Sequence, residues 1–180
     1  MKMLIVAAVA AVAVGAGGVA CAQSAGSGGK STLPSSIVLL DSTGKIAARA
    51  FNDTMMLITV HPTVAAPAFI HPIYDVDEKA ASGLATWASG GSVLFTSADC
   101  TRGPHIHTSA HAGVRATSQV ETPGGIILYV GAIGPARTAS VRSILYGSGC
   151  SGVTVQQNGL IPVDITVNLT TTYPPPLSLQ

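Results

Sequence analysis

Turn residues constrain the fold of this chain more than any other feature of its sequence. From residue 36 onward, short β-branched and aliphatic runs alternate with Gly, Pro, Asn and Asp, which is typical of short strands joined by turns. No window in this part shows a sustained apolar period of 3.6 residues, the pattern of an amphipathic helix. The sequence therefore predicts an all-β fold, a single antiparallel sandwich or barrel-like domain.

Strands are expected where apolar runs lie between these turn signals. They are 36–41, 45–50, 54–61, 68–74, 92–97, 105–109, 113–121, 126–132, 138–146, 153–157 and 160–169. Pro62 and Pro67 bracket an expected loop, and Pro72 indicates an edge strand. Residues 79–87 have the composition of a short helix, but Gly83 and the Gly90-Gly91 pair favour an irregular excursion over 75–91.

Three consecutive prolines follow Tyr173 in the tail "TTTYPPPLSLQ" (170–180). They favour an extended backbone without internal hydrogen bonds. We expect this tail to lie along an edge of the sheet and blunt it. Capture by a proline-recognising partner is the alternative.

The first 22 residues have the pattern of a secretory signal. A basic start at Lys2 precedes an apolar run over 4–14 and the small-residue site Ala20-Cys21-Ala22. The apolar run is about half of the ~20 residues that a membrane span needs. Lipidation of Cys21 is an alternative anchor, although Gly18 stands where such sites usually carry Leu. The expected organisation is a signal (1–22), a flexible Gly/Ser linker (23–35) and a β domain (36–180), with no transmembrane segment after signal removal.

Removal or lipidation of Cys21 leaves two cysteines, Cys100 and Cys150, for the fold. In an oxidising compartment such a pair indicates one disulfide that closes the domain. On the chain-entropy account, closing a loop of this length lowers the entropy of the unfolded chain and thereby stabilises the fold by about 4 kcal/mol. A catalytic or metal-binding pair is the alternative, but no C-x-x-C spacing is present. The expected location is therefore outside the cytoplasm, in the periplasm or the extracellular space.

Composition excludes one broad class of partner. Without Lys2, eight basic side chains balance the eight acidic ones, and none of them forms a basic stripe. Nucleic-acid binding consequently has no electrostatic support. Because so few charges keep the surface soluble, a protein or surface partner is a reasonable expectation.

The stretch "PHIHTSAH" (104–111) holds three of the five histidines. In an extended backbone His105 and His107 project from the same face, about 7 Å apart. With His111 as a third ligand, they would suit Zn(II) or Cu(II). The competing interpretation is a solvent-facing strand, which agrees with the neighbouring Thr108 and Ser109. His61 and His71 each precede a proline and are interpreted as strand exits.

No sequence pattern assigns a catalytic residue. The chain has no G-x-S-x-G elbow, and hydrolase chemistry of that kind needs a strand-turn-helix setting. The cluster Asp75, Asp77 and Glu78 falls in an expected loop, where calcium is the one ligand considered. We therefore expect a protein without enzymatic activity and without a cofactor, other than the metal of the histidine hypothesis.

Four motifs carry a resemblance to exported bacterial β-rich proteins of unknown function. They are "LLDSTGK" (39–45), "FTSADCTRGP" (95–104), "ILYVG" (127–131) and "PPPLSLQ" (174–180). The resemblance implies export, an all-β domain and a Cys100–Cys150 disulfide, and it implies no catalytic residues. His105 stands where such proteins often carry an aromatic residue, so the pattern does not explain the histidines. The expected function is a non-enzymatic binding or structural β module, with a histidine-rich Zn(II)- or Cu(II)-binding protein as the alternative.

Overall fold

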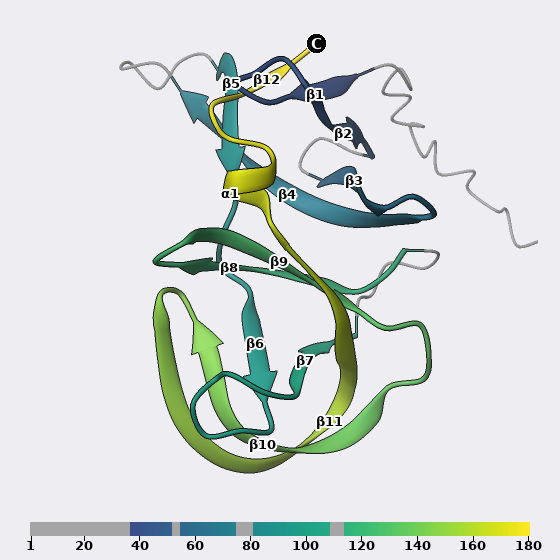
Figure 1. The fold of residues 1–180 in the computed structure, drawn as a ribbon, viewed down its shortest axis with the longest axis vertical. Helices are drawn as coiled ribbons and strands as arrows, with labels where there is room; N and C mark the ends of the chain where they lie inside the picture. Colours follow the sequence, from purple (N-terminus) through teal and green to yellow (C-terminus); the bar gives the residue numbers. More distant parts are fainter. Residues whose placement is uncertain (1–36, 52–54, 75–80, 109–113) are drawn as a thin grey trace, which may run out of the picture. The chain divides into compact units, whose positions relative to one another are not determined.

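A computed structural model describes residues 37–51, 55–74, 81–108 and 114–180 (Figure 1). The predicted signal, the linker and Cys21 lie outside these residues. In chain order the elements are β1 (Val38–Leu40), β2 (Ile46–Ala50), β3 (Met55–His61), β4 (Val64–Tyr74), β5 (Ala81–Trp87), β6 (Ser92–Phe95), β7 (Pro104–His107), β8 (Thr117–Thr122), β9 (Gly125–Gly131), β10 (Arg137–Tyr146), β11 (Gly149–Asn168), α1 (Leu169–Thr172) and β12 (Leu177–Leu179). The all-β prediction is confirmed. Within the described part, no helix is long and apolar enough to span a bilayer.

Six strands close into an antiparallel barrel in the order β1-β12-β5-β4-β3-β2. Successive side chains of a strand point to opposite faces of the sheet, so a chain built of strands shows no helical period. A barrel of this size has a narrow interior. Small side chains meet that limit, and they leave room for two aromatic rings, Trp87 and Tyr173. The buried alanines of the barrel are Ala47, Ala48, Ala66, Ala68 and Ala85.

The second sheet has the order β10-β6-β7-β11-β9-β8. Its central element is β11, which pairs in succession with β10, β7 and β9 along its 20 residues. β10 also pairs with β6, so β10, β6, β7 and β11 form a closed circuit of strands. Figure 1 shows β11 as a long arching strand. The expected break between 157 and 160 does not exist, because Gly159 takes a φ of +73° within a continuous strand.

The excursion predicted over 75–91 is corrected by the structure. Residues 81–87 form β5, a strand of the barrel between β4 and β12. The alternation that marks it is short: Ala85 and Trp87 are buried, whereas Leu84 is exposed. Gly83 adopts a φ of +74°, and the register of β4 against β5 shifts close to it. The glycine therefore marks a local irregularity inside the strand and does not interrupt it.

Both proline-based predictions about β4 are wrong. The expected loop between Pro62 and Pro67 is a hairpin, since β4 already begins at Val64. Pro72 lies in an inner strand of the barrel and not at an edge. The register explains how β4 tolerates both prolines: residues 64–69 pair with β3, and residues 70–74 pair with β5. Each proline therefore has a paired neighbour on one side only, where its missing N–H does less harm.

The tail does not lie along a sheet edge. Its strand β12 pairs with both β1 and β5 and thereby closes the barrel. Tyr173 contributes to this closure, because its backbone carbonyl accepts a 3.0 Å hydrogen bond from the indole Nε1 of Trp87. The two rings lie 6.4 Å apart between centroids and are tilted by 57°. The apolar side chains Tyr173 and Leu177 of the tail are thus part of the hydrophobic core.

Gln119 on β8 joins the second sheet to the barrel. Its side chain is 4% exposed. The amide oxygen accepts the Phe69 N–H, and Nε2 donates to the carbonyl oxygens of Phe69 and Ala88, each at 3.0 Å. Next to it, the Thr117 hydroxyl donates to the Pro67 carbonyl at 2.9 Å. Side chains of β8 therefore hydrogen-bond to β4 much as a neighbouring strand would.

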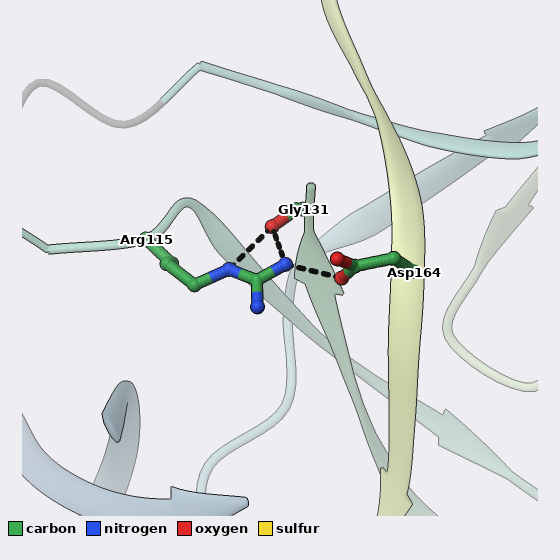
Figure 2. A network of polar contacts seen from close by, with 3 residues as sticks. All are labelled: Arg115, Gly131 and Asp164. Carbon is green, nitrogen blue, oxygen red and sulfur yellow. Dashed lines mark hydrogen bonds and ion pairs between the residues drawn. The ribbon is translucent and has the colours of Figure 1, made fainter. Parts of the chain in front are cut away.

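Arg115, just before β8, connects two other strands of this sheet. As Figure 2 shows, its Nε donates to the Gly131 carbonyl at 2.7 Å, and its Nη2 donates to the same carbonyl and to the Asp164 carboxylate. The register of β11 against β9 shifts between Val163 and Ile165. Asp164 lies in that irregularity, and its side chain turns to the guanidinium. The ion pair is partly exposed, so we expect it to contribute only modestly to stability.

We predict that Gln119→Leu lowers the free energy of unfolding by about 1–3 kcal/mol, because it leaves the partly buried Phe69 N–H without an acceptor. Urea unfolding of the oxidised protein measures the change. Gln156→Leu is the matched control, since Gln156 is exposed on β11. Equal unfolding free energies for the two variants would show that the amide is not a stabilising joint.

Candidate functional site

The predicted histidine segment is strand β7, between β6 and β11. His105 is half-buried and His107 is exposed, whereas Ile106 between them points into the core with Val93 and Phe95. The prediction that His105 and His107 share one face of an extended strand is confirmed. His111 lies outside the described residues, so the predicted third ligand is not placed.

One hydrogen bond orients the His105 ring. Its Nδ1 lies 2.8 Å from the Gly103 carbonyl oxygen. A carbonyl oxygen only accepts, so Nδ1 is the donor in this contact and Nε2 is the ring nitrogen left to bind a metal. Histidines that ligate metals commonly donate their second ring N–H to a carbonyl in this way. The arrangement is therefore compatible with Nε2 as a metal ligand.

The described residues do not complete a metal site. Among them, no group of three or more His, Cys, Asp or Glu side chains is placed to hold one ion. His61 and His71 belong to barrel strands β3 and β4, and they do not join His105 and His107 in the other sheet. Asp75, Asp77 and Glu78 fall outside the described residues. The metal and calcium hypotheses consequently remain predictions.

The predicted disulfide is confirmed. Cys100 and Cys150 are bonded, with their Cα atoms 6.0 Å apart and a sequence separation of 50. The bond ties the turn after β6 to the start of β11. Cys100 has a φ of +55°, a left-handed conformation that non-glycine residues seldom adopt.

Ser143 on β10 is hydrogen-bonded to the backbone of this turn. Its side chain is fully buried. The hydroxyl accepts a 3.0 Å hydrogen bond from the Cys100 N–H and donates one of 2.7 Å to the Ser97 carbonyl. The disulfide and the buried hydroxyl therefore act on the same residue and fix its unusual backbone conformation.

An Asp-x-Thr turn surrounds the cysteine and recurs in the barrel. The Asp99 carboxylate accepts the Thr101 hydroxyl at 2.7 Å, and this bond, aided by the Ser97 hydroxyl, lowers the pKa of Asp99 to about 2. Asp41 accepts the Thr43 hydroxyl at 2.6 Å and the Lys45 N–H at 3.0 Å, and its pKa is lowered chiefly by Thr43. Both turns fall within the motifs "LLDSTGK" and "FTSADCTRGP", where the repeated Asp-x-Thr spacing is the sequence signal for them.

Two surface clefts complete the candidate sites. One, of about 320 Å³, lies beside Gln119 and is lined by Phe69, by 88–91 and by 117–119. The other, of about 240 Å³, lies where β2 and β3 diverge, and is lined by Ile46, Ala47, Ala48, Arg49, Leu57, Thr59, Ala65 and Tyr173. In the described residues, β2 pairs with β3 only through Arg49–Leu57 and Ala50–Met56. Sequence reasoning missed this barrel cleft, because its wall joins residues more than 100 positions apart.

Comparisons with protein-family models, with curated proteins and with solved structures return no match. The resemblance to exported β-rich proteins is therefore a prediction, and function has to be argued from the chemistry of the surfaces described above.

We predict that Asp99 makes the free energy of unfolding depend on pH between about 2 and 4. The folded pKa of about 2 lies below the ordinary value of 3.8, so the unfolded chain binds more protons between these values. The stabilisation by Asp99 is thus complete above about pH 4 and is lost as the pH falls through about 2. Urea unfolding at stepped pH should show a shallower acid slope for Asp99→Asn than for wild type.

Thr101→Val provides the matched control for this experiment, since it removes the hydroxyl that is the main cause of the shift. It should reduce the acid slope in the same range. A difference between wild type and Asp99→Asn that is constant from about pH 2 to pH 5 would contradict the prediction.

Proposed function

We propose that this protein is a non-catalytic β module that acts outside the cytoplasm, in the periplasm or the extracellular space, by binding a ligand or a structural partner. The Cys100–Cys150 disulfide carries this proposal. Disulfides persist in oxidising compartments and are rare in the cytosol. The predicted secretory signal points to the same location.

The disulfide is a large contributor to the stability of a domain this size. The two cysteines are separated by 50 positions in sequence. On the chain-entropy account, closing such a loop lowers the entropy of the unfolded chain and stabilises the fold by about 4 kcal/mol. Domains of this kind have total stabilities of about 5–15 kcal/mol. Loss of the bond in a reducing compartment would therefore remove a substantial share of the stability.

The surface supports a binding role. Several large apolar side chains remain exposed on the described strands and turns, among them Tyr74, Ile133 and Tyr146. Two clefts with mixed polar and apolar walls lie on a scaffold held by closed strand circuits. Rigid elements of this kind position binding groups more accurately than loops do.

Export and oxidation can be tested together. The full chain expressed in a bacterial host should be recovered outside the cytoplasm with Gln23 as its first residue and without free thiols. A chain that lacks residues 1–22 and is kept in the cytoplasm should carry two free thiols and be about 4 kcal/mol less stable. Intact mass before and after thiol labelling gives both readings.

The Cys100→Ser/Cys150→Ser variant is the control for the stability change, and it should match the reduced wild type. A lipidated Cys21 would add mass and place the protein in the membrane fraction. Two free thiols in the exported wild type would refute the proposal.

A metal-binding role is the second candidate, favoured by the Nδ1 hydrogen bond of His105. In it, His105 and His107 bind Zn(II) or Cu(II) through ring nitrogens on one face of β7. The unprotonated nitrogen of a neutral imidazole ring is a suitable ligand for both ions. His111 is the predicted third ligand.

Isothermal titration of untagged protein with Zn(II) and Cu(II) tests this candidate. His105→Ala/His107→Ala should weaken binding by about tenfold or more. His61→Ala/His71→Ala is the matched control and should bind like wild type, and His111→Ala tests the third ligand. Indistinguishable titrations for wild type and the His105/His107 variant would eliminate the candidate.

A further inference from the structure

The barrel cleft between β2 and β3 combines an apolar wall with hydrogen-bond donors. Ile46 and Leu57 contribute aliphatic side chains, and Ala47, Ala48 and Ala65 leave the space open. Its volume of about 240 Å³ is below the range of about 300–1,000 Å³ typical of drug-sized ligands. The cleft therefore suits a ligand of small size.

Tyr173 contributes to the lining of the cleft, and its side chain carries a hydroxyl group. The residue is 9% exposed, and no hydrogen bond of this hydroxyl occurs in the described part of the chain. No buried side-chain polar atom there lacks a partner. It follows that the hydroxyl reaches solvent, and the cleft is the opening that Tyr173 lines. A ligand in the cleft can accept a hydrogen bond from it.

Two positive charges lie at the same place. Arg49 lines the cleft, is exposed and forms no ion pair within the described residues. Lys45 holds its Nζ 4.6 Å from the centroid of the Tyr173 ring. Among the described residues, the carboxylate nearest to Lys45 in sequence is Asp41, whose Oδ1 is engaged by Thr43 and by the Lys45 N–H. None of the lining residues is acidic.

We propose that the β2–β3 cleft of the barrel binds a small organic carboxylate with an apolar chain. The carboxylate contacts Arg49 and the Tyr173 hydroxyl, and the chain packs against Ile46, Leu57 and the alanines. Guanidinium groups match carboxylates in both charge and geometry. This inference rests on the proposed binding function and names the ligand class for it.

Hexanoate is a suitable probe, and its binding can be followed by ¹H–¹⁵N NMR of the oxidised protein recovered from expression of the full chain. Saturable shift changes are expected at the amides of 46–49, Leu57 and Thr59. Arg49→Gln should weaken hexanoate binding about tenfold through loss of a charge-assisted hydrogen bond. Arg142→Gln, an exposed arginine on β10 of the other sheet, is the matched control and should bind like wild type.

Two further measurements distinguish charge from apolar contact. Ala65→Leu fills the cleft from an exposed position and should abolish the shift changes while the rest of the spectrum is retained. The uncharged 1-hexanol should bind about tenfold more weakly than hexanoate to wild type.

Equal affinity for hexanol and hexanoate, an unchanged affinity in Arg49→Gln, or shift changes confined to other strands would each overturn the assignment. The same samples are checked for free thiols and for processing at Gln23. A folded, oxidised and processed protein that does not bind hexanoate refutes the ligand class and leaves the proposed location unaffected.

Discussion

The arrangement of the two sheets depends on one buried amide. Strand β4 changes its partner between Phe69 and Ile70, from β3 to β5. The backbone of Phe69 then faces the end of β5, where Ala88 supplies a single N–H at 2.9 Å. Gln119 supplies the missing acceptor and a second donor. Without this side chain the change of partners would leave the partly buried Phe69 N–H without an acceptor, which proteins seldom tolerate.

The hydrophobic core continues across this junction. Leu128 and Val130 of β9 belong to the same buried cluster as Ile58, Ala66 and Leu177 of the barrel. Gly91, at the point where the chain leaves the barrel, lies so close to Ser118 and Gln119 that a Cβ there would collide with them. The contact between the barrel and the second sheet therefore combines hydrogen bonds with apolar burial. The hydrogen bonds fix the direction of approach, and the packed side chains fix the distance.

The sequence predicted what short-range pattern determines. Short apolar runs separated by turn residues predicted the fold class, counting cysteines predicted the disulfide, and the two-residue period of a strand placed His105 and His107 on one face. It failed where distant segments decide the outcome. The prolines of β4 suggested an edge because their tolerance depends on the register with β3 and β5. Gln119 has no sequence signal at all, since its partners lie 31 and 50 residues away. The barrel cleft was missed for the same reason.

The position of β12 has a consequence for how the chain reaches its final state. The gap between β1 and β5 is filled only when residues 177–179 arrive, although β1 begins at residue 38. Chains are synthesised from the N-terminus, so most of the barrel sequence is available before the barrel can close. Pairings between such distant segments also form slowly. The topology thus postpones closure of the barrel until nearly the whole domain has been synthesised, so the partly synthesised chain has β1 and β5 without the strand that pairs with both.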